Sequence, residues 1–435
     1  MKNLEVEKEV LQVTSEEKQM TQELLSFIKK SPTCFHAIQQ AKEKVKAEGF
    51  VELKEQEPMN VVKGGKYFIT RNDSSMIAFV IPTEKAIGFH IAASHSDAPC
   101  FKLKEKPEIV AENKYVKLNV ENYGGMILST WLDRPLSVAG RVIVKENGQL
   151  QSKLVQLKDN SCIIPNVAIH FNREMNNGIK YNPQVDMQPL FSGKTNSTVR
   201  EMIASECNIE EAEILGSDLF LYNSADGCMV GVDEEFVCAP RLDDLQCAFT
   251  SLEGFLQAKP AQHIAMCAIF DNEEVGSSTR QGADSDFLDR TIERIVNSLG
   301  DKDVTQMLAG SFMLSADNAH GVHPNHGEKS DPTNRPYLNH GVVIKFHGSQ
   351  KYTTDGYSAA MVRDFAEEAG VNIQTFANRS DMPGGSTLGN ISTKHVSISS
   401  ADVGLPQLAM HSALETAGTK DTIAMVKLME VFFSK

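Results

Sequence analysis

The pattern of apolar and polar residues predicts an α/β beginning to the chain. From 16 to 50 the apolar spacing predicts two helices, and Ser31-Pro32 interrupts the pattern between them. Three strand-like runs follow, over 66–70, 76–81 and 88–93. The last run ends just before His95 and Asp97, so it would deliver both side chains to one end of a sheet.

The segment from 99 to 233 has a different pattern. Short alternating runs such as 115–120 are separated by turn signals, and Asn147-Gly148 is a dipeptide typical of a tight hairpin. Helical periodicity is missing until about residue 198. We therefore expect an inserted, mostly β domain at 99–233.

After Phe236 the chain alternates between strand and helix patterns. Predicted strands cover 263–270, 311–315, 341–347, 371–377 and 395–400, and predicted helices cover 244–258, 287–299, 357–369 and 419–434. This alternation predicts a mixed, largely parallel sheet with helices on both faces. The expected fold class is thus α/β, with a three-layer αβα catalytic domain built from 1–98 and 234–435.

The length, net charge and cysteine content of the chain limit its possible partners and its location in the cell. The 435 residues suggest about two domains, and their 41% hydrophobic content suffices for a buried core. A formal net charge of −14 argues against nucleic acid and anionic membranes as partners, and the longest apolar runs are far shorter than a membrane span. The charged start, 1–8, is followed by no apolar signal core. The eight cysteines include no Cys-x-x-Cys pair, which favours reduced thiols and a cytoplasmic location.

Six acidic or histidine-containing clusters carry the candidate chemistry. They are His95-Ser96-Asp97, Asp243-Asp244, Asp271-Asn272-Glu273-Glu274, Asp317 with His320, the Gly-rich loop around Asp381, and His411. Because ligands collect at the carboxyl ends of strands in such sheets, we expect these clusters to meet. Histidine nitrogen and carboxylate oxygen are ligands of zinc, and paired metal ions activate water while polarising a carbonyl. The clusters therefore indicate a dinuclear metal hydrolase.

Most clusters have a simpler explanation when each is taken alone. A histidine beside an aspartate is commonly a surface hydrogen bond, and Asp243-Asp244 before a helix suits an N-cap. In the functional interpretation Asp243 bridges two metals and Asp244 keeps the capping role. The run 271–274 is more specific, because neighbouring carboxylates after an apolar strand repel one another unless a cation or a shared proton holds them. One glutamate there could bind metal while the other acts as general base.

Other hydrolase signatures are missing from the sequence. There is no Gly-x-Ser-x-Gly elbow, no phosphate loop and no His-Glu-x-x-His helix. What remains is the order His, Asp, Glu-Glu, Asp, His over more than 300 residues.

That order resembles the aspartyl aminopeptidase family of dinuclear zinc exopeptidases, in a bacterial-type version, over essentially the whole chain. The resemblance is carried by the segments 94–99, 240–245, 271–277, 315–317 with 319–320, and 406–412. It implies two Zn²⁺ per subunit, with Mn²⁺ or Co²⁺ as substitutes. The implied ligands are His95, Asp243 and Asp317 for one ion, and Asp243, Glu274 and His411 for the other.

The resemblance also implies roles outside the ligand set. Glu273 would be the general base and Asp97 the partner that orients it or His95. The inserted domain would be a dimerisation domain of a tetrahedral homo-dodecamer, in which His170 reaches a neighbour's active site. Candidate substrate-binding residues are His320, Lys345, Tyr352, Asp381 and Gly385. Animal members carry a cysteine where Gly384 stands, a departure that bears on the preference for acidic residues.

The predicted function is an aminopeptidase that removes N-terminal residues, Asp or Glu first, from short peptides. Three alternatives stay open at this point: a dinuclear aminopeptidase of broad or non-acidic specificity, a related amide deacylase, and a catalytically silent scaffold around a structural metal. The pair Glu273-Glu274 argues against the scaffold, because a structural site needs no unliganded base.

Overall fold

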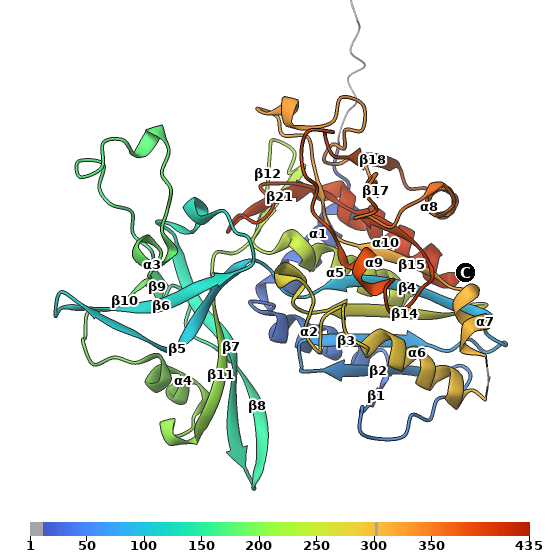
Figure 1. Cartoon of the computed structure of the whole chain (residues 1–435), viewed down its shortest axis with the longest axis horizontal. Coiled ribbons are helices and arrows are strands. Elements are labelled where there is room, and N and C mark those ends of the chain that lie inside the picture. Colours follow the sequence, from blue (N-terminus) through green and yellow to red (C-terminus); the bar gives the residue numbers. More distant parts are fainter. Residues whose placement is uncertain (1–11, 301–302) are drawn as a thin grey trace, which may run out of the picture.

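A computed structural model describes residues 12–300 and 303–435, and the charged start at 1–8 lies outside these residues. The chain forms two lobes, one built around a large sheet and one around a smaller closed sheet (Figure 1). The first lobe contains both the N-terminal helices and the C-terminal helix, so the smaller lobe is inserted into it.

A nine-stranded mixed sheet forms the centre of the first lobe. In spatial order its strands are β1 (Val51–Leu53), β2 (Lys66–Arg71), β3 (Ser75–Val80), β14 (His263–Phe270), β4 (Gly88–His95), β15 (Phe312–Ala316), β19 (Ser399–Gly404), β17 (Val342–Phe346) and β18 (Ile373–Ala377). The four central strands β14, β4, β15 and β19 are parallel to one another. Their carboxyl ends therefore lie at one edge, where Phe270 pairs with His95.

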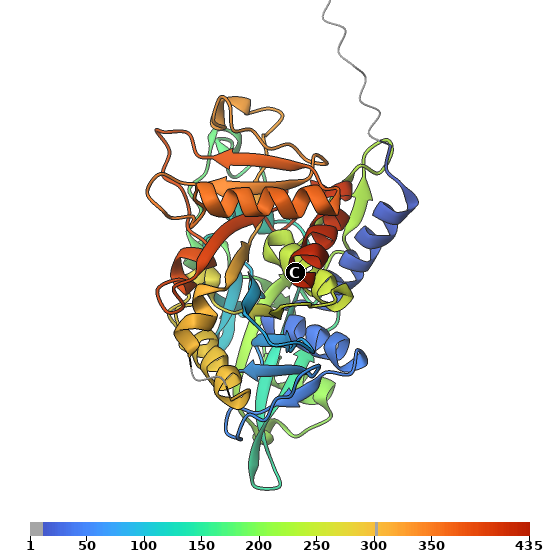
Figure 2. The same cartoon turned by 90° about the vertical axis from the view of Figure 1, so that its right-hand side faces the viewer.

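Helices cover both faces of this sheet and bury one apolar cluster on each. On one face lie α2 (Cys34–Ala47), α5 (Leu242–Gln257), α8 (Gly356–Ala369) and α10 (Thr419–Ser434), with α1 (Ser15–Lys29) packed outside them. On the other face lie α6 (Phe287–Ser298), α7 (Val304–Ala309) and α9 (Leu388–Ser392). Figure 2 shows the same arrangement from the side. The predicted three-layer α/β class is confirmed.

The smaller lobe is a seven-stranded sheet with its own apolar core. Its strands run in the order β11 (Ile214–Asn223), β5 (Cys100–Ala111), β6 (Tyr115–Tyr123), β10 (Leu190–Ser192), β9 (Cys162–Ile163), β7 (Pro135–Glu146) and β8 (Gln149–Gln156). A further pairing of β11 with β7 closes the sheet into a barrel. The two helices of this lobe are α3 (Pro183–Asp186) and α4 (Val199–Cys207). The predicted β-rich segment and the hairpin at Asn147-Gly148 are confirmed.

A five-stranded sheet that the sequence did not predict joins distant parts of the chain. It consists of β12 (Cys228–Val230), β13 (Phe236–Ala239), β21 (Glu415–Gly418), β20 (Pro406–Leu408) and β16 (Ala319–His320). These strands are two to four residues long, so their periodicity is too short to recognise in sequence. The sheet brings the segment after Asp317 beside the segment that carries His411.

Most elements lie where the pattern placed them, but the prediction for 395–400 was wrong. The strand there is β19, which begins at Ser399 and runs to Gly404. Its middle carries Asp402, a fully buried carboxylate that accepts hydrogen bonds from Thr353 and Thr387. A polar residue in that position hid the strand, whereas Val396 and Ile398 before it pack into the core without pairing.

Two further findings concern membrane-spanning helices and the cysteines. Among the described residues, no helix has the length and apolar character needed to cross a membrane. All eight cysteines are free, and four of them are buried.

Candidate metal centre

Four buried side chains converge at the carboxyl edge of the large sheet. They are His95, Asp243, Asp244 and Asp317, and one ligand-type atom from each lies within 4.8 Å of the others. His95 ends β4 and Asp317 follows β15 directly, which explains why residues far apart in sequence meet. His95 Nε2 lies 3.5 Å from Asp243 Oδ1 and 4.0 Å from Asp244 Oδ2.

A second group shares Asp243 with the first. Asp243, Glu274 and His411 also bring their ligand-type atoms within 4.8 Å of one another. His411 Nε2 lies 3.4 Å from Asp243 Oδ2 and 3.5 Å from Glu274 Oε2. Because the two oxygens of Asp243 face different histidines, this carboxylate is placed to bridge two ions.

Glu273 lies beside both groups. Together with His95 and Glu274 it forms a third set of atoms within the same 4.8 Å limit. Glu273 and Glu274 belong to a 3-10 turn, Glu273–Val275, that follows β14, and the preceding Asn272 has a left-handed φ of 63°. This turn directs the two neighbouring carboxylates toward the centre.

Both histidines are oriented by backbone carbonyls. His95 Nδ1 donates to the carbonyl oxygen of Asp97 at 3.1 Å, and His411 Nδ1 donates to that of Gly125 at 2.7 Å. A proton held on Nδ1 leaves Nε2 of each ring free to bind metal.

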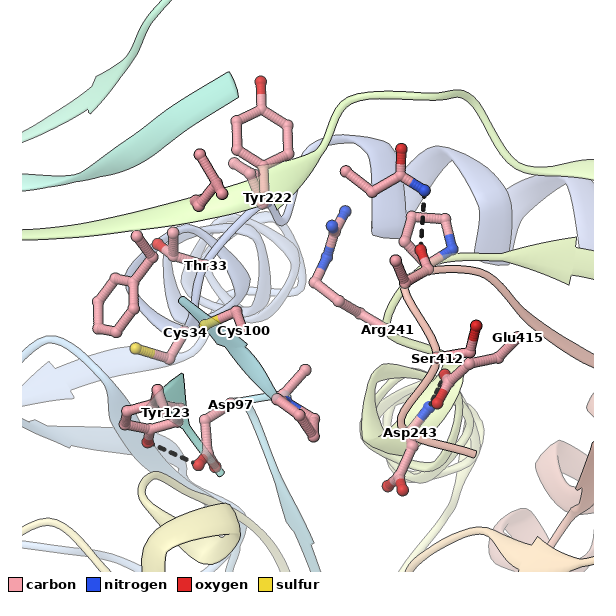
Figure 3. A pocket seen from close by; sticks show the side chains of 18 of the residues that line it. Thr33, Cys34, Asp97, Cys100, Tyr123, Tyr222, Arg241, Asp243, Ser412 and Glu415 are labelled. Atoms are coloured by element: carbon pink, nitrogen blue, oxygen red, sulfur yellow. Dashed lines mark hydrogen bonds between the residues drawn. The ribbon is translucent and has the colours of Figure 1, made fainter. Parts of the chain in front are cut away.

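Asp97 connects the histidine to the glutamate turn. Its Oδ1 accepts the N–H of Glu273 and its Oδ2 that of Glu274, both at 3.2 Å. Its Oδ2 also accepts the hydroxyl of Tyr123 at 2.7 Å, as Figure 3 shows. Tyr123 comes from the barrel lobe, and sequence reasoning missed it because a lone tyrosine before Gly-Gly carries no distinguishing signal.

The capping role assigned to Asp244 was wrong. Helix α5 has no side-chain cap, and Asp243 and Asp244 both have non-helical backbone angles within its first turn. Asp244 Oδ2 instead accepts the backbone N–H of His95 at 3.1 Å. Asp244 therefore belongs to the first group, and its position next to Asp243 was the signal that could have revealed it.

Crowding of buried carboxylates dominates the electrostatics. Burial raises the pKa of Glu273 to about 8 and that of Glu274 well above its usual range. Neighbouring carboxylates add to this increase, and His95 opposes it. Burial likewise raises the pKa of Asp244 and Asp317. For Asp243, hydrogen bonds with His411 and His95 outweigh burial and hold the pKa below its usual value. Such a cluster is stabilised when a cation enters it.

Unpaired carboxylate oxygens are a second observation in favour of a bound metal ion. Asp243 Oδ1, Asp244 Oδ1 and Glu274 Oε1 are buried and have no hydrogen-bond partner among the described residues. Buried polar atoms are normally paired, so three unpaired carboxylate oxygens on residues of these groups favour a bound cation as their partner. Imidazole nitrogen with carboxylate oxygen is a common zinc ligand set.

The candidate substrate-binding residues divide into two sets. Lys345 is 2% exposed and donates to the carbonyl oxygen of Asp317 at 2.7 Å, while its Nζ lies 5.2 Å from the ring centre of Tyr352. His320 is an exposed residue of β16 whose ring contacts Phe376. These three lie around Asp317.

The remaining candidates lie apart from the two groups. Asp381 and Gly385 are on an exposed loop, where Asp381 pairs with Arg379 at 2.7 Å. His170 lies on an exposed loop of the barrel lobe. Among the described residues, the hydrogen bonds and ion pairs of the two groups do not involve His170.

Comparisons with known proteins agree on one family. The model of the aminopeptidase I zinc metalloproteases (M18) matches residues 27–433. A curated relative from Clostridium novyi, described as a "probable M18 family aminopeptidase 2", is 47% identical over 423 residues, covering 95% of this chain and 98% of the relative.

Solved structures give the same result. A chain of the Ape4 and Nbr1 complex has a TM-score of 0.93 at 32% identity, covering 97% of this chain and 87% of that chain. The S. cerevisiae mApe1 dodecamer has a TM-score of 0.83 at 27% identity, covering 96% and 97%. Because a family model and a full-length relative both span nearly the whole sequence, this chain belongs to the aminopeptidase I family of zinc metalloproteases, M18.

Proposed function

We propose that this M18 aminopeptidase works with two zinc ions per chain and removes acidic residues from the N-termini of short peptides. His95, Asp243 and Asp317 would hold one ion, and Asp243, Glu274 and His411 the other. The observation that carries this proposal is Asp243, whose two oxygens face a different histidine in each group. When bound, such paired ions lower the pKa of a water and polarise the substrate carbonyl.

In this proposal Glu273 moves the protons. It is placed beside both groups and carries a pKa raised by burial to about 8, which suits a group that takes a proton from water and returns it to the leaving amine. Asp97 orients this step by accepting the backbone N–H of Glu273 and of Glu274. The two neighbouring glutamates thus divide the work of ligand and base.

The acidic preference rests on the environment of Lys345. Its buried ammonium group lies against Asp317 and Tyr352, and its pKa is raised to well above its usual range because Asp317 and other anions outweigh burial. A permanent positive charge at this edge would attract a substrate carboxylate. His320, Asp381 and Gly385 complete the proposed substrate-binding set.

We place the barrel lobe, 99–233, at a dimer interface within a larger homo-oligomer. Three apolar side chains around His170 are strongly exposed, with Val167 at 55%, Ile169 at 45% and Phe171 at 87%. Exposed apolar residues that adjoin one another mark interaction surfaces. A second copy covering this loop would bring His170 to the neighbouring centre, where it would donate to the developing oxyanion. The related mApe1 is a dodecamer, and we extend that assembly to this chain.

One experiment separates this function from its alternatives. The metal-free chain is titrated with Zn²⁺, and peptides starting with Asp, Glu, Ala or Leu are digested with and without N-terminal acetylation. The proposal expects two ions per chain, fastest release of Asp or Glu, and no cleavage of acetylated peptides. Cleavage of acetylated substrates would identify a deacylase, and equal rates on all free N-termini would leave a broad aminopeptidase.

A further inference from the structure

Glu415 is a buried carboxylate directly behind the metal centre. It opens β21, is 1% exposed, and lies four residues after His411. Its Oε2 accepts the backbone N–H of Asp243 at 3.0 Å, and its Oε1 accepts that of His411 at 2.7 Å. Figure 3 shows Glu415 reaching the backbone of Asp243 from a separate segment. One side chain therefore holds two metal-ligand residues at once.

The two residues held by Glu415 lie on backbones that need support. His411 has a left-handed φ of 67°, as has Ala409 before it at 55°. Arg241, two residues before Asp243, also has a left-handed φ of 58°. Such conformations are unfavourable for non-glycine residues and persist only when the surroundings fix them. The hydrogen bond from His411 to Glu415 is one such constraint.

The connection joins two segments of the chain and adds to the pairing of β13 with β21, in which Ala239 lies opposite Glu415. Asp243 is at the start of α5, whereas His411 is on the loop between β20 and β21. Their side chains meet only through Asp243 Oδ2 and His411 Nε2, 3.4 Å apart. On the side away from the centre, the two oxygens of Glu415 fix both backbones relative to each other.

We propose that Glu415 is a positioning residue of the metal centre, which sets the spacing between Asp243 and His411 and so the affinity for divalent cations. This inference rests on the proposed function of these two residues as metal ligands. Glu415 lies outside the two groups of candidate ligands, and its oxygens accept the backbone N–H groups of Asp243 and His411 and, at 3.4 Å, the side-chain NH₂ of Gln407.

The substitution Glu415→Gln tests the need for two acceptors. Glutamine keeps the size of the side chain but replaces one acceptor oxygen with an NH₂ group. That NH₂ would face a backbone N–H, so either Asp243 or His411 would shift. Substitutions of residues that hold metal ligands typically weaken metal affinity or activity by about 10–100-fold. We expect a loss of this size in Zn²⁺ affinity.

Asp421 provides a matched control elsewhere in the fold. It is a fully buried carboxylate on α10, and it accepts the backbone N–H of Asn339 at 2.6 Å and of Gly341 at 2.8 Å. Asp421→Asn makes the same chemical change away from the two metal groups. It should lower thermal stability and leave Zn²⁺ affinity within about twofold of the unmodified chain.

The measurement is calorimetric titration of each metal-free full chain with Zn²⁺, paired with the melting temperature of the metal-free form. Glu415→Gln should lose 10–100-fold in affinity for at least one ion. Glu415→Asp, which keeps both acceptor oxygens, should recover part of that affinity and serves as the second variant if the first fails to fold. Unchanged affinity in Glu415→Gln, or equal affinity losses in Glu415→Gln and Asp421→Asn, would overturn the proposal. An unmodified chain that binds fewer than two ions would instead overturn the dinuclear function, and the affinity comparison would still decide the role of Glu415.

Discussion

At the scale of single residues, side chains of the same chemical type make different contacts in the candidate metal centre. Glu273 and Glu274 are neighbours in sequence, yet only Glu274 joins the group of Asp243 and His411. Asp243 and Asp244 are also neighbours, and they differ because Asp243 faces both histidines while Asp244 holds the backbone of His95. The local backbone, not the residue type, assigns these roles.

The first prediction concerns Glu273. Glu273→Gln should keep both metal ions and lose about 10²–10⁴-fold in kcat, because only proton transfer is removed. Asp243→Ala should lose metal, since it deletes a ligand shared by both groups. Metal content by elemental analysis and the rate on a peptide are measured on the same samples. A Glu273→Gln chain with near-normal kcat would contradict the assignment of the general base.

The second prediction concerns Lys345. If its charge attracts the substrate, Lys345→Met should lower kcat/KM far more for peptides beginning with Asp or Glu than for those beginning with Ala or Leu. Lys345 also has a structural contact, because it donates to the carbonyl oxygen of Asp317. If that contact were its main role, Lys345→Met would lower the rate on every peptide alike. Equal losses on all four peptides would assign Lys345 to Asp317 alone and remove it from the substrate pocket.

At the scale of elements, the two ends of the central strands have different functions. The candidate metal centre lies at the carboxyl ends of β4 and β14, while aromatic and imidazole rings pack around their opposite ends. Near that end, His90 is 4% exposed, stacks on His263 with ring centres 3.8 Å apart, and packs against Phe432. Its Nδ1 donates to the carbonyl oxygen of Phe432 at 2.8 Å. This arrangement ties α10 to the sheet.

The third prediction follows from the burial of His90. Burial, with the neighbouring His263, lowers the pKa of His90 from 6.5 to about 4. The unfolded chain therefore takes up the proton first as the pH falls, so stability is lost between about pH 6.5 and 4 and is fully present above that window. The contribution is on the order of 3 kcal/mol for a single group.

The substitution His90→Asn isolates this contribution. Asparagine keeps a donor for Phe432 and does not titrate, so the variant should show a shallower loss of stability below pH 6.5. Urea unfolding of both chains from pH 4 to 8 measures the difference in slope, and His323→Asn, at an exposed position, is the control. Parallel pH profiles of the unmodified chain and His90→Asn would show that His90 has the same pKa in the folded and the unfolded chain, and would contradict the prediction.

At the scale of the whole molecule, the barrel lobe contributes to the centre from within the chain. Tyr123 of β6 bonds to Asp97, and Gly125 just after it accepts from His411. The same lobe exposes the loop around His170 with Phe171 87% accessible. This lobe therefore combines an exposed apolar loop with a direct contact to His411, one of the candidate metal ligands.

The fourth prediction tests this coupling through His170. His170→Ala should stay folded and metal-loaded and lose about 10²–10³-fold in rate, the cost of losing one oxyanion donor. Mixing it with Glu273→Ala chains should restore part of the activity, because a mixed pair contains one intact site. Mixing Glu273→Ala with Asp243→Ala is the control, since both changes damage the same centre. Confirmed subunit exchange without recovery would show that His170 does not act on a neighbour.

The sequence alone determined the α/β class, the β-rich insertion and the family, because periodicity, turn dipeptides and spaced motifs are local properties. His95, Asp243, Glu274, Asp317 and His411 were candidates from the sequence, and the structure brings them together in two groups that share Asp243, while their role as metal ligands stays a prediction. Only the tertiary structure decided what Asp244, Tyr123 and Glu415 do. Each acts through a backbone or side chain more than twenty residues away, and hydrogen bonds over such separations leave no periodic trace in a single sequence.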